Sequence, residues 1–115
     1  DDEEAIVDVL QQTLVHLGYR VEGESSSKKV LEIFRSNPAR FDLVITDMTM
    51  PGLTGDKLAR ELIDIRPDIP IILCTGFSEK VTNEEALSIG IRELLLKPLD
   101  TADLADKVRK VLNLR

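Results

Sequence analysis

The chain has 115 residues, the length of one ordinary domain, and 43% of them are hydrophobic, which is enough for one buried core. Its formal net charge of −6 argues against direct binding to nucleic acid, which calls for a basic surface. No apolar run approaches the length needed for membrane insertion, no signal peptide is visible, and the single cysteine, Cys74, excludes an internal disulfide, so we expect a cytoplasmic location.

The first part of the chain predicts a helix, a short strand and a second helix. Apolar residues follow helical spacing over residues 6–17, and Gly18 is expected to end that helix. Apolar and polar residues alternate over residues 19–23, which predicts a strand. The serines at 25–27 favour a capping loop, and the apolar residues within 30–34 predict the buried face of the next helix.

Three apolar strands alternate with helices through the rest of the chain. The strands are expected at residues 43–45, 71–74 and 93–96, and the helices around residues 58–65, 83–89 and 104–112. The first of these strands reads as buried on both faces, and Pro51, Gly52 and Gly55 then break the chain into a loop. This alternation predicts one domain over residues 1–115, in which helices cover both faces of a parallel sheet.

Each of the three strands leads into a polar side chain: Asp47, Thr75 and Lys97. Because parallel strands that end together bring their last side chains to one edge, a carboxylate, a hydroxyl and an ammonium group are expected to converge there. Asp1 and Asp2 would reach the same edge if a strand preceded them. Taken alone, Asp47 is also compatible with a turn cap and the acidic start with a solvated helix end, so the prediction rests on the ordered set.

This set resembles the receiver domain of two-component response regulators over essentially the whole chain. The resemblance is carried by Asp1-Asp2, by Asp47 with the following Met50-Pro51-Gly52, by Thr75 and by Lys97-Pro98. It implies an α/β fold, a flavodoxin-like three-layer sandwich with a parallel five-stranded sheet of order 2-1-3-4-5, whose first strand is absent from the given chain. The sequence around Asp47 and Thr75 also resembles receivers attached to hybrid sensor histidine kinases.

The resemblance implies a role for each of these residues. Asp47 would be the phosphoacceptor, taking a phosphoryl group from a phosphohistidine on a sensor histidine kinase or a histidine phosphotransfer domain. Thr75 would donate a hydrogen bond to that group, and Lys97 would offset the charge on its oxygens. Mg²⁺ is the implied cofactor, held directly by Asp2, Asp47 and the backbone carbonyl of Thr49, and by Asp1 through water.

Four positions are expected to tune switching or the lifetime of the phosphoryl group. Leu94 stands where the family often has an aromatic residue, so switching would rely on backbone and helix shifts. Neither Thr49 nor Phe77 can act as a general base near pH 7, so we expect slow hydrolysis, with Phe77 shielding the phosphoaspartate. Phe77→Ala should then shorten the half-life of the phosphoryl group, and an unchanged or longer half-life would count against shielding. The peptide bond before Pro98 is implied to be cis.

The family has an apolar strand immediately before the acidic pair. Without it, the second and third strands would stand about 9–10 Å apart, twice the usual spacing. We therefore expect the native polypeptide to continue upstream of Asp1, or another segment to fill the slot. A stable monomer whose intact mass corresponds to 115 residues would contradict this expectation.

Two other classes of function stay open. A phosphohydrolase of the haloacid-dehalogenase type also carries an Asp nucleophile, but it uses a second Asp where this chain has Thr49. A non-phosphorylated interaction module would keep only the fold. As a separate domain the chain is expected to catalyse only its own phosphorylation and slow dephosphorylation, whereas a hybrid parent would be a histidine kinase. The downstream protein partner is not specified by the sequence, and a weak homodimer is left open.

Overall fold

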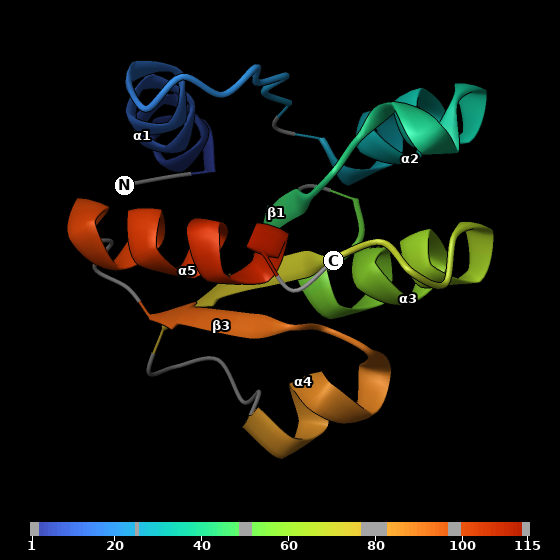
Figure 1. Cartoon of the computed structure of the whole chain (residues 1–115). Helices are drawn as coiled ribbons and strands as arrows, with labels where there is room; N and C mark the ends of the chain where they lie inside the picture. The colour runs from blue at the N-terminus through green and yellow to red at the C-terminus, as the bar shows by residue number, and fades with distance from the viewer. Residues whose placement is uncertain (1–2, 25, 49–51, 77–82, 97–99, 114–115) are drawn as a thin grey trace.

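The computed structural model describes residues 3–24, 26–48, 52–76, 83–96 and 100–113, and these residues form an α/β domain (Figure 1). The helices are α1 (Glu3–His16), α2 (Ser27–Ser36), α3 (Gly55–Ile65), α4 (Asn83–Ile89) and α5 (Thr101–Asn113), with a short 3₁₀ turn η1 (Pro38–Arg40). The strands are β1 (Val44–Asp47), β2 (Ile71–Thr75) and β3 (Glu93–Leu96). Each strand and helix predicted between residue 27 and residue 113 is therefore confirmed, with small shifts at its ends.

The sheet is parallel, with the order β1-β2-β3. Val44 is paired with Ile71 of β2, and Ile72 of β2 is paired with Glu93 of β3. The central strand β2 is buried along its whole length, as its run of apolar residues predicts. In contrast, β1 is only half-buried at Val44 and Ile45, because β1 is the edge strand among the described residues, so the prediction of a strand buried on both faces was too strong there.

Successive side chains of β2 point to opposite faces of the sheet, so the core has two layers. Ile71 and Leu73 face one apolar cluster, which also contains buried side chains of α2, α3 and α4. Ile72 and Cys74 face the other cluster, with buried side chains of α1 and α5. Cys74 is thus a buried core residue, as predicted. The result is the expected three-layer arrangement, with a sheet between two layers of helices (Figure 1).

Gly18 ends α1 as predicted, through a Schellman motif. Its φ of +97° is a conformation that residues with a side chain rarely adopt. The N–H of Gly18 donates to the carbonyl of Val15, and the N–H of Tyr19 donates to the carbonyl of Leu14, each over 3.0 Å. The last carbonyls of the helix are therefore satisfied, and the chain turns sharply towards residue 19.

Three local predictions were wrong. Residues 19–23 form no strand, because no strand lies beside them in the described part of the chain. Ser26 occupies the N-cap position of α2 without making a side-chain cap hydrogen bond, and Ser27 is already helical. Gly55, predicted to break the chain as part of a loop, is the first residue of α3. Each of these outcomes depends on tertiary neighbours that local sequence patterns do not specify.

Candidate functional site

Asp47 and Thr75 end two neighbouring strands at the same edge of the sheet. Asp47 is the last residue of β1 and is paired with Cys74, and Thr75 follows as the last residue of β2. The two residues are 7% and 2% exposed, respectively. In parallel sheets, ligands bind beyond this edge. The predicted placement of these two residues is confirmed, and it brings a carboxylate and a hydroxyl to one end of the sheet.

The backbone at Asp47 is fixed by its own strand and by α3. One residue beyond Asp47, the N–H of Met48 donates to the carbonyl of Cys74 over 2.8 Å, which extends the pairing with β2. The N–H of Gly55 donates to the carbonyl of Met48, also over 2.8 Å. A Cβ atom at Gly55 would lie 2.3 Å from the carbonyl oxygen of Asp47, so only glycine permits this approach. The end of β1 and the start of α3 therefore form one close-packed unit.

Ser27 anchors the far end of the loop that follows β1. Its side chain is fully buried, and its Oγ accepts a hydrogen bond from the N–H of Leu53 over 2.5 Å. This contact joins the start of α2 to the loop that begins directly after Asp47. Sequence reasoning missed Ser27 because it stands in a run of serines, where nothing distinguishes a buried anchor from a cap.

The carboxylate of Asp47 is buried in an arrangement that suits a hard cation. Its Oδ1 atom accepts no hydrogen bond from the described residues, although Asp47 does have other interactions. Burying a carboxylate is costly unless the carboxylate is paired or bound to a metal. Oxygen donors of this kind are the ligands that Mg²⁺ prefers. Among the described residues no group of three acidic, histidine or cysteine side chains converges, so a complete metal shell would need further ligands.

The other predicted site residues divide into two groups. Leu94 lies on β3, where it is half-buried against the cluster that α2, α3 and α4 share, and its carbonyl accepts a hydrogen bond of 2.5 Å from Nζ of Lys107. Sequence reasoning did not single out Lys107. The remaining predicted residues lie outside the described part of the chain: Asp1, Asp2, Thr49, Phe77, Lys97 and Pro98. β3 is described up to Leu96, and the predicted place of Lys97 therefore falls outside the described residues.

Two further observations concern parts of the structure away from Asp47 and Thr75. No helix in the described ranges is long and apolar enough to cross a membrane. A cavity of about 550 Å³ lies beside β1, and its lining includes Thr46 but neither Asp47 nor Thr75. The cavity is therefore separate from the polar edge of the sheet.

Comparison with protein families gives a match that covers most of the chain. The model of the family described as the response regulator receiver domain matches residues 1–109. The two-component response regulator ARR12 of Arabidopsis thaliana is 34% identical over 90% of this chain, and the transcriptional regulatory protein ZraR of Escherichia coli K12 is 34% identical over 97% of it. The chain spans only 17% and 25% of the lengths of these two relatives.

Solved structures give the same result for the fold. A response regulator receiver domain protein from Clostridium thermocellum is 35% identical, with a TM-score of 0.90 and coverage of 98% of this chain and 90% of that chain. A CheY-like receiver domain protein from Methanospirillum hungatei is 27% identical, with a TM-score of 0.87 and coverage of 98% and 89%. The strands β1, β2 and β3 therefore correspond to the last three strands of the five-stranded, flavodoxin-like sheet.

Proposed function

Because the chain belongs to the family of response regulator receiver domains, we propose that Asp47 is the residue in it that accepts a phosphoryl group. The single observation that carries the proposal is the position of this carboxylate, buried at the end of β1 beside the end of β2, where Thr75 lies. Carboxylates in such positions serve as nucleophiles that form covalent acyl phosphates. The donor would be a phosphohistidine on a histidine kinase or a histidine phosphotransfer domain.

In the proposed reaction one carboxylate oxygen of Asp47 attacks the phosphorus atom of the phosphohistidine. The new O–P bond forms as the P–N bond breaks, the electron pair of that bond stays with the imidazole nitrogen of the donor, and a proton on the other ring nitrogen makes the leaving imidazole neutral. The product is a mixed anhydride on Asp47 and an unmodified histidine on the partner. Thr75 donates a hydrogen bond to a phosphoryl oxygen, and the ammonium group of Lys97 offsets its charge.

The residues of this chain that would hold Mg²⁺ are the carboxylates of Asp1, Asp2 and Asp47 and the backbone carbonyl of Thr49. When bound, Mg²⁺ supplies positive charge close to the transferred group, which is a large part of what phosphoryl transfer requires. The buried Oδ1 atom of Asp47 supports this assignment. Thr49 and Phe77, neither of which can accept a proton near pH 7, would leave the acyl phosphate to hydrolyse slowly.

The proposal extends to the setting in which the domain works. The relatives are response regulators many times longer than this chain, so a stimulus, a cognate kinase and an output would all come from protein outside residues 1–115. We propose a cytoplasmic location, since the single cysteine lies in the core and a histidine kinase would deliver its phosphoryl group there. The conformational change on phosphorylation would involve Leu94 and the peptide bond before Pro98.

Labelling with acetyl phosphate tests the assignment of Asp47. Wild-type protein with Mg²⁺ should gain one phosphoryl group per chain, and Asp47→Asn should gain none while keeping the same fold. Asp64→Asn, a change at an exposed carboxylate of α3, is the matched control and should label like wild type. Equal labelling of wild type and Asp47→Asn would overturn the proposal. Sustained hydrolysis of a generic phosphoester would instead favour a phosphohydrolase.

Two substitutions test whether the hydroxyl group of Thr75, and not only the size of its side chain, matters for the response to phosphorylation. Thr75→Ser keeps the hydroxyl and should be phosphorylated and switch as wild type does. Thr75→Val keeps a β-branched side chain of similar size at a position that is 2% exposed, and it removes the hydroxyl group. It should still be labelled but show smaller NMR shift changes on phosphorylation. Full shift changes in Thr75→Val would contradict the role assigned to the hydroxyl.

A further inference from the structure

Four polar or charged residues are buried among the residues that the structure describes: Ser27, Thr46, Asp47 and Thr75. The last three belong to β1 and β2, and two of them end these strands at the proposed phosphoryl site. Ser27 differs from them, because it lies on α2 and is 0% exposed. Burying a hydroxyl group is costly unless the group is hydrogen-bonded, so the contacts of Ser27 indicate what its hydroxyl does.

The hydroxyl group of Ser27 contacts a neighbouring loop. A serine at the start of a helix usually accepts a hydrogen bond from the backbone of its own helix. Here Ser26 occupies the N-cap position without such a bond, and Ser27 is the first residue of α2. Its Oγ accepts a hydrogen bond of 2.5 Å from the N–H of Leu53, which is 26 residues away in the sequence. The bond therefore joins α2 to the loop between β1 and α3.

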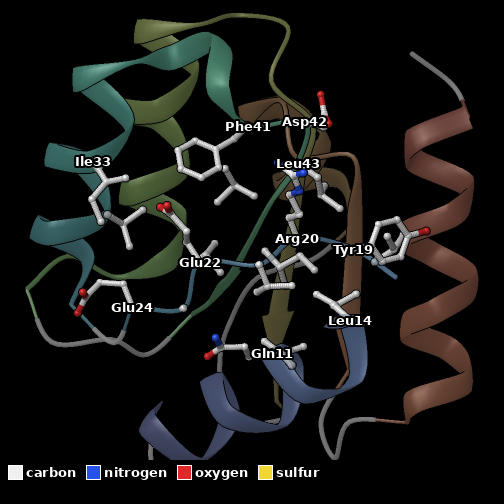
Figure 2. A pocket seen from close by; sticks show the side chains of 18 of the residues that line it. Gln11, Leu14, Tyr19, Arg20, Glu22, Glu24, Ile33, Phe41, Asp42 and Leu43 are labelled. Carbon is white, nitrogen blue, oxygen red and sulfur yellow. The ribbon is translucent and has the colours of Figure 1, made fainter. Parts of the chain in front are cut away.

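The backbone of this loop lies directly against the start of α2. A Cβ atom at Gly52 would stand 2.7 Å from Oγ of Ser27 and 3.4 Å from Cγ of Lys28. The side chain of Leu53 packs against the apolar cluster that α2, α3 and α4 share. Other residues of α2 line the cavity beside β1, among them Ile33, which Figure 2 shows there. Ser27 does not line that cavity, so its contact with the loop is a separate feature.

The loop after β1 is held at both of its described ends. At one end, the N–H of Met48 donates to the carbonyl of Cys74 over 2.8 Å. At the other end, Leu53 is held by Ser27. Thr49, whose backbone carbonyl is a proposed ligand of Mg²⁺, lies between these two ends in the sequence. A segment whose ends are already fixed loses less conformational freedom when it binds a ligand, and this raises the affinity.

We propose that Ser27 is a positioning residue for the Mg²⁺ site, an inference that rests on the function proposed above. Its hydrogen bond to Leu53 fixes the loop after Asp47 and thereby strengthens the binding of Mg²⁺. Groups that support metal ligands from outside typically change metal affinity about ten- to a hundredfold. Ser27 acts through the loop backbone, so we expect the lower end of this range, a loss of about tenfold, when its hydroxyl is removed.

The test titrates the unphosphorylated protein with Mg²⁺ and follows the backbone amides by NMR, without any phosphoryl donor. Ser27→Ala should weaken Mg²⁺ binding about tenfold, and the Leu53 amide should exchange with solvent faster than in wild type. Ser36→Ala, at the exposed serine that ends α2, should bind Mg²⁺ as wild type does. Faster exchange at Leu53 with unchanged Mg²⁺ affinity would show that the hydrogen bond is only structural, and would overturn the proposal. Unchanged exchange at Leu53 would overturn it as well.

A core substitution controls for loss of stability. Val111 is 1% exposed and lies in the apolar cluster of α1 and α5, on the opposite face of the sheet from α2. Val111→Ala destabilises the protein without changing the contact between Ser27 and Leu53, so it should leave the affinity for Mg²⁺ unchanged. Equal losses of affinity in Val111→Ala and Ser27→Ala would overturn the proposal.

Two glycine substitutions test the same contact from the side of the loop. Gly52 and Gly18 have nearly equal φ angles, +96° and +97°, so alanine causes similar backbone strain at both positions. The added Cβ atom would stand 2.7 Å from Oγ of Ser27 at position 52, whereas no atom lies within 4 Å at position 18. Gly52→Ala should therefore weaken Mg²⁺ binding about tenfold, and Gly18→Ala should not change it. Equal affinities would contradict the proposal, and this pair decides the question if Ser27→Ala does not fold.

Asp47→Asn separates this inference from the proposed function. Because it removes a proposed ligand, it should weaken Mg²⁺ binding by at least about tenfold. If Asp47→Asn binds Mg²⁺ as tightly as wild type, or if wild type does not bind it, the metal assignment is wrong and the role of Ser27 is overturned with it. If Asp47→Asn loses Mg²⁺ and Ser27→Ala does not, the proposed function stands and only the inference about Ser27 is overturned.

Discussion

Gly55→Ala gives the sharpest test of how Asp47 is positioned, because two physical effects predict opposite signs. Gly55 is the first residue of α3, and alanine is the better helix former by up to about 1 kcal/mol. If helix propensity decided the outcome, the substitution would stabilise the protein. The structure predicts the reverse, because the added Cβ would stand 2.3 Å from the carbonyl oxygen and 2.9 Å from the carbonyl carbon of Asp47.

The size of the effect follows from these contacts. Ordinary contact begins at 3.4 Å, so the carbonyl of Asp47 has to retreat by about 1 Å, and Cδ1 of Leu73, at 2.7 Å, has to move as well. Overpacking of this kind costs about 1–3 kcal/mol, and here a backbone group must yield rather than the end of a flexible side chain. Because a backbone group must move, we take a cost of about 2–3 kcal/mol, and subtracting the gain in helix propensity of about 1 kcal/mol gives an expected net loss of about 1–2 kcal/mol in the free energy of unfolding.

The same displacement should slow phosphorylation. Misplacing a reacting group by about 1 Å can cost on the order of a hundredfold in rate. We would measure urea unfolding and the initial rate of labelling by acetyl phosphate. Gly18→Ala is the control: no atom lies within 4 Å of the added Cβ, so the φ of +97° alone should cost about 1–2 kcal/mol, with normal labelling. A stabilised Gly55→Ala protein, or one that labels as fast as Gly18→Ala, would refute the reasoning.

Further substitutions test the core and the loop anchor. Leu62→Ala should lower the free energy of unfolding by about 2–5 kcal/mol, because this side chain is fully buried. Leu87 is 66% exposed, so Leu87→Ala should change the free energy of unfolding by less than about 0.5 kcal/mol. Comparable losses in urea titrations would contradict the assigned core. Ser27→Ala leaves the N–H of Leu53 without its acceptor and should cost about 1–3 kcal/mol, against less than about 0.5 kcal/mol for Ser36→Ala, whose hydroxyl is exposed. Equal effects of the two serine substitutions would show that the hydrogen bond to Leu53 contributes little.

The elements that could be predicted from sequence are those whose signal is local. β2 follows Pro70 and consists of an apolar run, residues 71–74, that leads into Thr75, and its burial follows from that run. α4 and β3 have the predicted limits because Gly90 marks the end of the helix and apolar residues fill the strand. Helix and strand alternation then restricts the architecture to a parallel sheet with helices on both faces.

The failed prediction at residues 19–23 shows the limit of that reasoning. Alternation indicates that a segment could be half-buried in a sheet, but a strand also needs a partner at hydrogen-bonding distance. Among the described residues no strand lies beside this segment, and Glu22 makes an ion pair with Arg40. Local pattern cannot supply this information, since it depends on what lies next to the segment in space.

The site also contains residues that local sequence patterns predict and residues that they do not. Asp47 and Thr75 could be predicted because strand ends are visible in the sequence, and the topology of a parallel sheet brings them together. Ser27 and Gly55 could not, because their roles come from contacts with residues that are distant in the sequence or across a turn. A serine within a serine run and a glycine after a loop have many ordinary explanations until the contacts are known.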